Sequence, residues 1–165
     1  MEVIWAPWRM DYILGHKPDT CIFCLPPEEA GEDAARLVLK RGRHAFVVMN
    51  KYPYNNGHLM VVPYCHTCDF ASLSPEAGLE CMELMQLCTV ALKTFASPDG
   101  INIGLNLGRA AGAGVGEHLH WHIVPRWNGD SSFIAVTAET RVIPQYLSET
   151  YAGLLPIFKT LKPTL

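Results

Sequence analysis

Three histidines alternate with apolar residues late in the chain, at His118, His120 and His122. Successive side chains of a β-strand point to opposite faces, so this spacing predicts three imidazoles on one face and apolar side chains on the other. Two kinds of chemistry fit the pattern: a His-x-His pair offers two ligands to one zinc ion, and a neutral histidine oriented by its neighbours acts as a nucleophile. A structural interpretation, three solvent-facing polar residues, is less favoured because many other side chains fill such positions.

Cysteines supply further metal-binding material. Cys21 and Cys24 form one C-x-x-C pair, Cys65 and Cys68 form a second, and His66 lies inside the second pair. The N-terminal sequence MEVIWAPWRM lacks the basic region of a secretory signal, so we expect a cytoplasmic, reducing location in which such pairs favour metal binding. Spacing alone allows a structural site of four thiolates, with His66 as a competing ligand. The structural alternative for Cys21 and Cys24 is two buried thiols, and for Cys65 and Cys68 it is two thiols that simply pack or face solvent.

A glycine-rich stretch, residues 108–116, precedes the histidines. It lacks the lysine and hydroxyl residue of a P-loop and the spacing of a dinucleotide-binding fingerprint. Because it leads into the histidine strand, its exposed backbone N–H groups are candidates for holding a phosphate beside His120. We therefore predict a flexible loop that accommodates an anion.

The elements that position these residues follow from hydrophobic patterning. Residues 44–50 and 58–63 are predicted as buried strands that form an antiparallel hairpin, joined by a turn of proline, asparagine and glycine. Residues 101–107 and 118–124 are predicted as a second pair of strands, the latter closed by Pro125.

One long amphipathic helix is predicted to begin at Pro75, with Ser74 as its N-cap, and to end near residues 97–100. Its apolar stripe contains Cys81 and Cys88, which we interpret as core residues. The hairpin, the helix and the second pair of strands together predict an α+β fold with a mostly antiparallel sheet.

Two more helices are expected outside this framework. A short helix is predicted within residues 28–39 and a C-terminal helix over residues 144–165. The side chains expected to face inward from the C-terminal helix are Tyr146, Leu147, Leu154 and Phe158.

Composition limits both size and partners. The chain has 165 residues, of which 49% are hydrophobic and 18% charged, which predicts a single domain over residues 1–165 with a loop-rich segment over residues 1–40. The formal net charge of -3 supplies no basic field for nucleic acid or acidic lipid, and the apolar runs fall far short of a membrane span. We expect neither a nucleic-acid partner nor a membrane.

The histidine segment fits a known motif. Residues 118–124, HLHWHIV, match the pattern H-φ-H-φ-H-φ-φ, where φ is apolar, and the chain therefore resembles the histidine triad (HIT) family, which acts on nucleotides. A wider match makes it similar to the diadenosine tetraphosphate phosphorylase branch of that family. The wider match comprises WAPWR at 5–9, Asn50, YPYN at 52–55, GHLMVVP at 57–63, Asn102, NLG at 106–108, PRW at 125–127, GD at 129–130 and VIPQ at 142–145.

The resemblance implies a HIT-like fold and roles for individual histidines. His120 would attack the α-phosphorus and form a nucleotidyl-imidazole intermediate, and His122 would hydrogen-bond the phosphate. His58, at the start of the second predicted strand, resembles an additional active-site histidine of the family.

Nucleotide contacts are implied at four further positions. Asn50 lies where the family has a ribose-binding residue that is usually Asp, and Asn106 resembles a nucleotide-contacting Asn. Ala113 and Gly114 occupy the loop position at which relatives have a glycine and a Ser or Gln that contacts phosphate. This chain lacks that polar side chain.

Many bacterial members of the family also hold a structural zinc ion. The ligands that the resemblance implies here are Cys21, Cys24, His66 and His118. We prefer this set to four thiolates because His66 ends the family's P-x-x-H sequence, PYCH at 63–66. Cys65 and Cys68 remain an alternative.

The implied reaction is a two-step nucleotidyl transfer through His120. With inorganic phosphate as the acceptor, diadenosine tetraphosphate gives ATP and ADP; with water, the protein is a dinucleoside polyphosphate or nucleoside phosphoramidate hydrolase. A nucleotide-binding sensor with little turnover is the non-enzymatic alternative. The resemblance also implies a homodimer. Arg109, Arg126 and Arg141 are candidates for binding distal phosphates, and solvated surface charge is the alternative for each.

Overall fold

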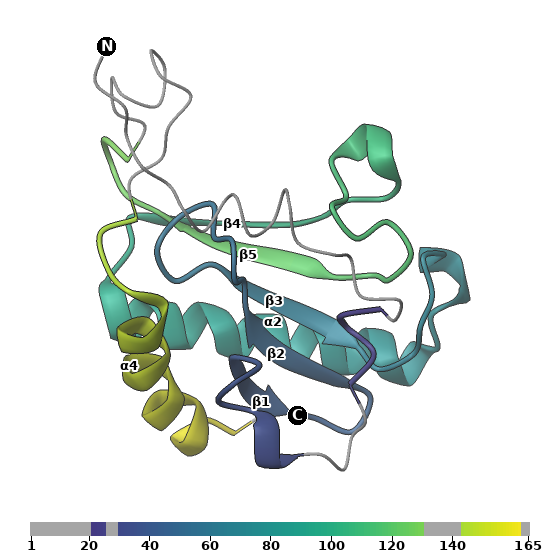
Figure 1. The fold of residues 1–165 in the computed structure, drawn as a ribbon, viewed down its shortest axis with the longest axis horizontal. Helices are drawn as coiled ribbons and strands as arrows, with labels where there is room; N and C mark the ends of the chain where they lie inside the picture. The colour runs from purple at the N-terminus through teal and green to yellow at the C-terminus, as the bar shows by residue number, and fades with distance from the viewer. Residues whose placement is uncertain (1–20, 26–29, 131–142, 163–165) are drawn as a thin grey trace.

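An antiparallel sheet of five strands forms the centre of the protein. The structure, a computed structural model, describes residues 21–25, 30–130 and 143–162. Among them the strand order is β1-β2-β3-β5-β4, and every neighbouring pair is antiparallel (Figure 1). The strands are β1 (Val38–Arg41), β2 (Ala45–Met49), β3 (Leu59–Pro63), β4 (Gly100–Leu105) and β5 (Trp121–Arg126).

Two helices cover one face of this sheet. α2 (Pro75–Ala96) contacts β2, β3 and β5, and α4 (Leu147–Thr160) contacts α2 and β1. The N-terminus of α2 is the predicted one, because the Ser74 side chain accepts a hydrogen bond from the Ala77 N–H and Pro75 needs no such partner. Three short 3-10 helices complete the described elements: η1 (Ala30–Glu32), η2 (Phe70–Ser72) and η3 (Arg109–Ala111).

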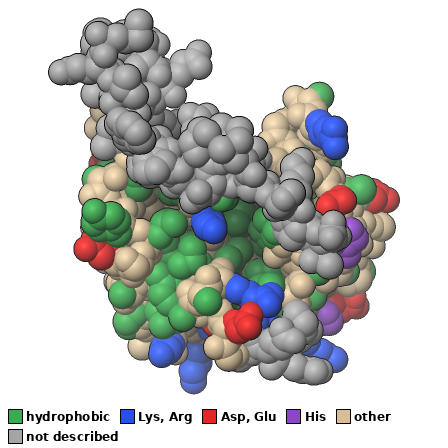
Figure 2. Space-filling model, viewed as in Figure 1, with side chains coloured by type: hydrophobic (Ala, Val, Ile, Leu, Met, Phe, Trp, Pro, Cys, Tyr) green, Lys and Arg blue, Asp and Glu red, His purple; other side chains and the backbone are tan. Residues whose placement is uncertain are grey.

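Alternation along the strands divides the core into two clusters. In β2, Ala45, Val47 and Met49 pack in the cluster under α2, whereas Phe46 and Val48 pack in a second cluster. This second cluster, called the site-face cluster below, consists of Phe23, Leu25, Val38, Phe46, Val48, Met60 and Val62. In the view of Figure 2, hydrophobic side chains line a hollow in the middle of the molecule.

Most predicted elements are confirmed, with altered ends. The hairpin strands are β2 and β3, the long helix is α2, and Cys81 and Cys88 are buried core residues. The α+β class with an antiparallel sheet is confirmed. The sequence did not predict β1, and the short helix expected within residues 28–39 is reduced to η1 in the described part of that range.

The predicted histidine strand starts too early. β5 begins at Trp121 because the Leu119 N–H donates a hydrogen bond to the Thr67 carbonyl and the ring of His118 donates one to the Pro63 carbonyl. Because of these bonds, residues 118–120 do not pair with β3. β5 also continues through Pro125, which lies beyond the last residue paired with β3, so its missing N–H removes no bond to that strand.

The C-terminal helix is shorter than predicted. Leu154 and Phe158 are buried as expected, but Tyr146 is 78% exposed, so the prediction that it faces inward is wrong. Tyr146 is the N-cap of α4 and has an extended backbone, which takes its side chain off the buried face of the helix. β4 likewise ends at Leu105, two residues earlier than predicted. Residues 1–20, in the predicted loop-rich segment, lie outside the described residues.

Candidate active site and metal centre

The three histidines of the motif are buried on the face of the sheet opposite α2. Phe23 of the site-face cluster contacts the rings of His118 and His120, with centroid separations of 5.8 Å and 4.9 Å. The ring of His122 lies 4.9 Å from that of His120. The apolar residues between the histidines pack in the core under α2, so the predicted alternation of faces is confirmed although β5 begins late.

A backbone carbonyl determines which nitrogen of His120 carries the proton. Its Nδ1 lies 2.8 Å from the carbonyl oxygen of His118, and a carbonyl only accepts, so Nδ1 carries the proton and donates it. Nε2 is therefore the nitrogen with the lone pair. Burial lowers the pKa of His120, although the bond to the His118 carbonyl opposes that shift. The neutral imidazole that results has the tautomer that a nucleophile attacking through Nε2 requires.

A second set of hydrogen bonds determines the tautomer of His122. The Tyr54 N–H donates to Nδ1 of His58 at 3.0 Å, which leaves the His58 proton on Nε2. Nε2 of His58 lies 2.9 Å from Nδ1 of His122 and donates to it. Nε2 of His122 consequently carries that ring's own proton. His122 is thus arranged as a neutral donor beside His120.

Burial keeps His122 neutral as well. It lowers the pKa of His122 to about 4, and the neighbouring charge of His120 acts in the same direction. At neutral pH the two rings therefore combine one nucleophilic lone pair with one hydrogen-bond donor, an arrangement suited to attack on a phosphorus whose oxygen the donor holds.

Two contributors to this site escaped the sequence analysis. The ring of Tyr54 stacks on His122 at 5.4 Å between centroids, and its backbone N–H begins the chain of hydrogen bonds through His58. Phe23 packs on His120 from between the two cysteines of the first pair. The available signals were an aromatic residue four positions before His58 and an aromatic residue inside a C-x-x-C.

Asn50 supports the same chain of hydrogen bonds. Its Oδ1 accepts from the Tyr52 N–H at 2.9 Å, and its Nδ2 lies 3.3 Å from Nδ1 of His58. Only an amide can donate at the second contact, which an aspartate at this position could not do. The structure thus places Asn50 against His58.

The remaining predicted nucleotide contacts lie in the loop that connects β4 with the histidines. Asn106 is half-buried, and its amide nitrogen lies 3.9 Å from the position that a Cβ of Gly112 would take. Ala113 is half-buried and Gly114 is exposed. Neither position carries a polar side chain.

The four residues of the preferred zinc set converge. One ligand atom from each of Cys21, Cys24, His66 and His118 lies within 4.8 Å of all the others. Nδ1 of His118 is 3.4 Å from Sγ of Cys21 and 3.7 Å from Sγ of Cys24, and Nδ1 of His66 is 3.2 Å from Sγ of Cys24. Zinc–sulfur and zinc–nitrogen bond lengths place neighbouring S and N ligands of a tetrahedral ion about 3.5 Å apart. Two thiolates and two imidazoles at these separations fit zinc.

The orientation of His118 supports ligation through Nδ1. Its Nε2 donates to the Pro63 carbonyl at 2.8 Å, which leaves the lone pair on Nδ1, facing the two sulfurs. The four-thiolate alternative is not supported, because Cys65 and Cys68 are exposed and belong to no cluster of ligand atoms among the described residues.

Comparison with known proteins agrees with this fold. The HIT domain family model matches residues 30–129, more than half of the chain, and the chain belongs to that family. It is 40% identical over 157 residues to AP-4-A phosphorylase of Mycobacterium tuberculosis, a match covering 91% of this chain and 80% of that protein. An uncharacterized HIT-like protein of Saccharolobus solfataricus is 31% identical over 146 residues, which cover 86% of this chain and 98% of that protein.

A solved structure bears on the metal centre. The chain is similar to a zinc-bound histidine triad family protein from Mycobacterium smegmatis, with a TM-score of 0.66, 29% identity, and coverage of 85% of this chain and 94% of that one. Among the described residues, no helix has the length and apolar character needed to span a membrane.

Proposed function

We propose that this protein transfers a nucleotidyl group through a covalent bond to His120 and phosphorolyses diadenosine tetraphosphate to ATP and ADP. The observation that carries the proposal is the hydrogen bond from Nδ1 of His120 to the His118 carbonyl, which leaves Nε2 free to attack. Membership of the HIT family and similarity to a phosphorylase support a nucleotide-processing enzyme.

In the first step Nε2 of His120 donates its lone pair to the α-phosphorus. The bond from phosphorus to the bridging oxygen breaks, and its electron pair leaves on ATP. The ring becomes a cation that keeps its Nδ1 proton, and the His118 carbonyl accepts that proton's hydrogen bond more strongly. The Nε2–H of His122 donates to a phosphate oxygen and stabilises the charge that develops there.

In the second step an acceptor oxygen attacks the same phosphorus, and Nε2 of His120 leaves with its electron pair. Phosphate as the acceptor gives ADP. The loop around Ala113 and Gly114 favours this acceptor, because it lacks a side chain that would occupy the space and Gly114 offers a backbone N–H donor instead. Asn50 and Asn106 are proposed to hold the nucleoside.

Zinc is proposed as a structural ion held by Cys21, Cys24, His66 and His118. Bound there, it would cross-link the turn at Cys21 and Cys24 to His66, which follows β3, and to His118, which precedes β5. A closed site of four protein ligands leaves no position for substrate. Thiolate ligands need a reducing environment, which supports a cytoplasmic location.

The decisive experiment follows the transfer of a labelled α-phosphate from the substrate to the enzyme. Enzyme quenched in acid after mixing with α-³²P-labelled diadenosine tetraphosphate is expected to carry the label on His120, and His120→Ala to lose both label and turnover by several powers of ten. Label on another residue, or normal turnover by the variant, contradicts the assignment.

The acceptor is tested by product analysis with and without millimolar phosphate. ADP that appears only when phosphate is present supports phosphorolysis, whereas AMP plus ATP under both conditions makes the protein a hydrolase of the same family. Gly114→Gln is expected to move the product ratio toward hydrolysis while the rate of the first step stays unchanged.

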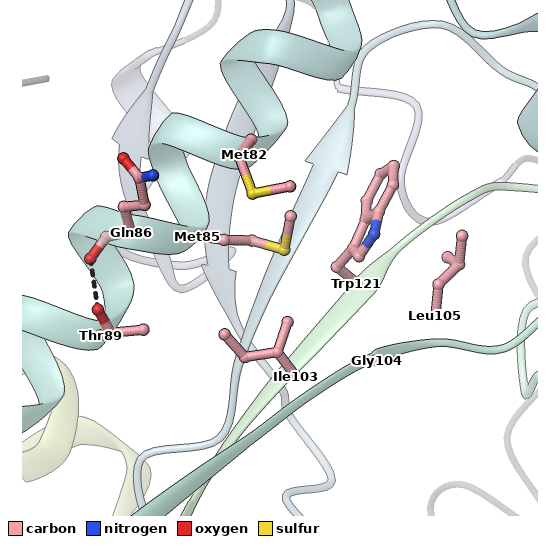
Figure 3. A pocket seen from close by; sticks show the side chains of 8 residues that line it. All are labelled: Met82, Met85, Gln86, Thr89, Ile103, Gly104, Leu105 and Trp121. Atoms are coloured by element: carbon pink, nitrogen blue, oxygen red, sulfur yellow. Dashed lines mark hydrogen bonds between the residues drawn. The ribbon is translucent and has the colours of Figure 1, made fainter. Parts of the chain in front are cut away.

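We further propose that two copies associate through β4 and the neighbouring face of α2. Among the described residues β4 is an edge strand of the sheet, and a groove of about 330 Å³ beside it is lined by Met82, Met85, Gln86, Thr89, Ile103, Gly104, Leu105 and Trp121 (Figure 3). Pairing of two β4 strands about a twofold axis would satisfy their free backbone groups and bury both grooves.

A further inference from the structure

Within the loop that joins β4 to the histidine segment, the glycine-rich stretch of residues 108–116 contains a single side chain able to form strong hydrogen bonds. Residues 108–116 read GRAAGAGVG, and Arg109 is that side chain. This stretch has no hydroxyl or amide side chain for the phosphates that depart when His120 is nucleotidylated, and Asn106, which precedes it, is proposed to hold the nucleoside. Recognition of the leaving group from this side therefore depends on backbone N–H groups and on Arg109.

The loop is folded against the active site. Gly108 and Gly112 have positive φ angles of 80° and 91°, and the Gly108 carbonyl accepts hydrogen bonds from the N–H groups of Ala111 and Ala113. Val115 packs against the site-face cluster, whose Phe23 also contacts His120. Figure 1 shows this loop rising above the sheet at the end where β5 begins.

The Arg109 side chain lies across the loop, beside Gly116. Its Cγ is 4.0 Å from the position that a Cβ of Gly116 would take, and Gly116 is two residues before His118. Arg109 is exposed and has no carboxylate partner among the described residues. Its charge is therefore available to a ligand.

The other candidate arginines differ in this respect. Arg126 donates from Nε and Nη2 to the two carboxylate oxygens of Asp130, at 2.6 Å and 2.7 Å, and from Nη1 to Asn102. These bonds occupy its guanidinium, so its candidacy for distal phosphates is not supported. Arg141 lies outside the described residues.

We propose that Arg109 binds the distal phosphates of the leaving polyphosphate and makes the site selective for leaving groups with several negative charges. This inference rests on the proposed function and deepens it. As the bond between Nε2 of His120 and phosphorus forms, the electron pair of the broken P–O bond stays on the departing polyphosphate. A guanidinium offers that group paired donors and a fixed positive charge, whereas a small neutral leaving group gains nothing from it.

Binding of ATP and AMP, measured by isothermal titration calorimetry, tests the contact without requiring turnover. Arg109→Ala is expected to weaken ATP binding about 10- to 100-fold, as loss of charged hydrogen bonds does, and to leave AMP binding unchanged. Arg109→Lys should recover part of the loss. Arg43→Ala, which removes an exposed arginine from the turn between β1 and β2, is the matched control and should change neither affinity. Equal affinities for ATP in Arg109→Ala and wild type overturn the inference.

Turnover separates this inference from the proposed function. For Arg109→Ala, kcat/KM is expected to fall at least tenfold with diadenosine tetraphosphate and to stay unchanged with adenosine phosphoramidate, whose leaving group is ammonia. Equal losses on both substrates overturn the inference while His120 chemistry stands. Wild-type enzyme that turns over neither substrate overturns the proposed function, and the ATP and AMP affinities then still decide whether Arg109 binds distal phosphates.

Discussion

At the scale of single residues, backbone groups determine the protonation pattern of the active site. The His118 carbonyl holds the Nδ1 proton of His120, and the Tyr54 N–H directs the His58 proton toward His122. Carbonyls and amide N–H groups do not titrate, so both tautomers persist across the pH range in which the rings are neutral. A pair of histidines with fixed and opposite roles follows from this arrangement.

The lowered pKa of His122 predicts how stability depends on pH. In the unfolded chain a histidine binds a proton near pH 6.5, whereas folded His122 binds one only at about pH 4. Between these values the unfolded state holds more protons, so the free energy of unfolding decreases as the pH falls from about 7 to about 4, and the slope then levels off. Urea unfolding at a series of pH values measures this slope.

A variant tests how much of this pH dependence of the free energy of unfolding comes from His122. His122→Gln is expected to show a shallower dependence than wild type, and a remainder is expected from His120, whose pKa burial also lowers. Identical slopes in the variant and in wild type would show that His122 already binds its proton normally in the folded protein.

At the scale of elements, one carboxylate joins α2 to the turn between β1 and β2. Oε1 of Glu80 accepts from the Arg43 N–H at 2.8 Å, and Oε2 accepts from the N–H groups of His44 and Ala45. A side chain on Gly42 would collide with this carboxylate, since its Cβ would lie 2.6 Å from Oε1. The turn is thus built around the Glu80 side chain, which holds the hairpin edge on the helix.

Glu80→Gln is expected to destabilise the protein by about 1–3 kcal/mol, because an amide NH₂ would face one of the backbone N–H donors and leave it without an acceptor. Urea unfolding measures the change. Glu83→Gln, less than one helical turn further along α2, is the matched control and should shift the midpoint little. Nucleotidyl transfer by the folded Glu80→Gln variant should be unchanged, and equal midpoints for the two variants would contradict the role of Glu80.

The metal centre makes a separate prediction about elements. The proposed zinc ion would join the turn at Cys21 and Cys24 to the segments that follow β3 and precede β5, so Cys24→Ser is expected to lose zinc and to lower the melting temperature. Transfer by the protein that remains folded should persist, because the proposed nucleophile is the His120 imidazole and not a metal-bound group. Metal analysis and calorimetry measure the first effects, and Cys68→Ser is the control that should retain the metal. Chelation that stops turnover before it unfolds the protein would instead indicate a catalytic ion.

Sequence patterning predicted the elements whose signals lie in side-chain type. For the hairpin, α2 and the alternating histidines, the pattern of apolar residues in the sequence matches the pattern of buried residues in the structure. It did not predict β1, which is only four residues long, nor the late start of β5, which depends on a ring reaching a distant carbonyl. The roles of the Tyr54 N–H and the His118 carbonyl could not be predicted either. Nearly every residue has such backbone groups, and only the folded structure determines which side chains they contact.

At the scale of the whole molecule, the proposed catalytic face and the proposed dimer face are distinct. The histidines lie on the side of the sheet opposite α2, whereas the groove beside β4 lies between that strand and α2. Apolar side chains continue the groove surface along the outer face of α2, at Leu79, Met82 and Val90. A contiguous exposed apolar surface next to an edge strand is typical of association between protein chains.

Association is tested at Ile103, which lies on β4 and is 48% exposed. Sedimentation velocity at micromolar concentration is expected to give twice the 18.3 kDa chain mass for wild type and the single-chain mass for Ile103→Lys. A charge there would be desolvated in the paired state and hydrated in the free one, so it favours the single chain. Tyr146→Lys, at an exposed aromatic residue beside α4, is the matched control and should remain dimeric. A single-chain mass for wild type, or a dimer of Ile103→Lys, would exclude this face as the interface.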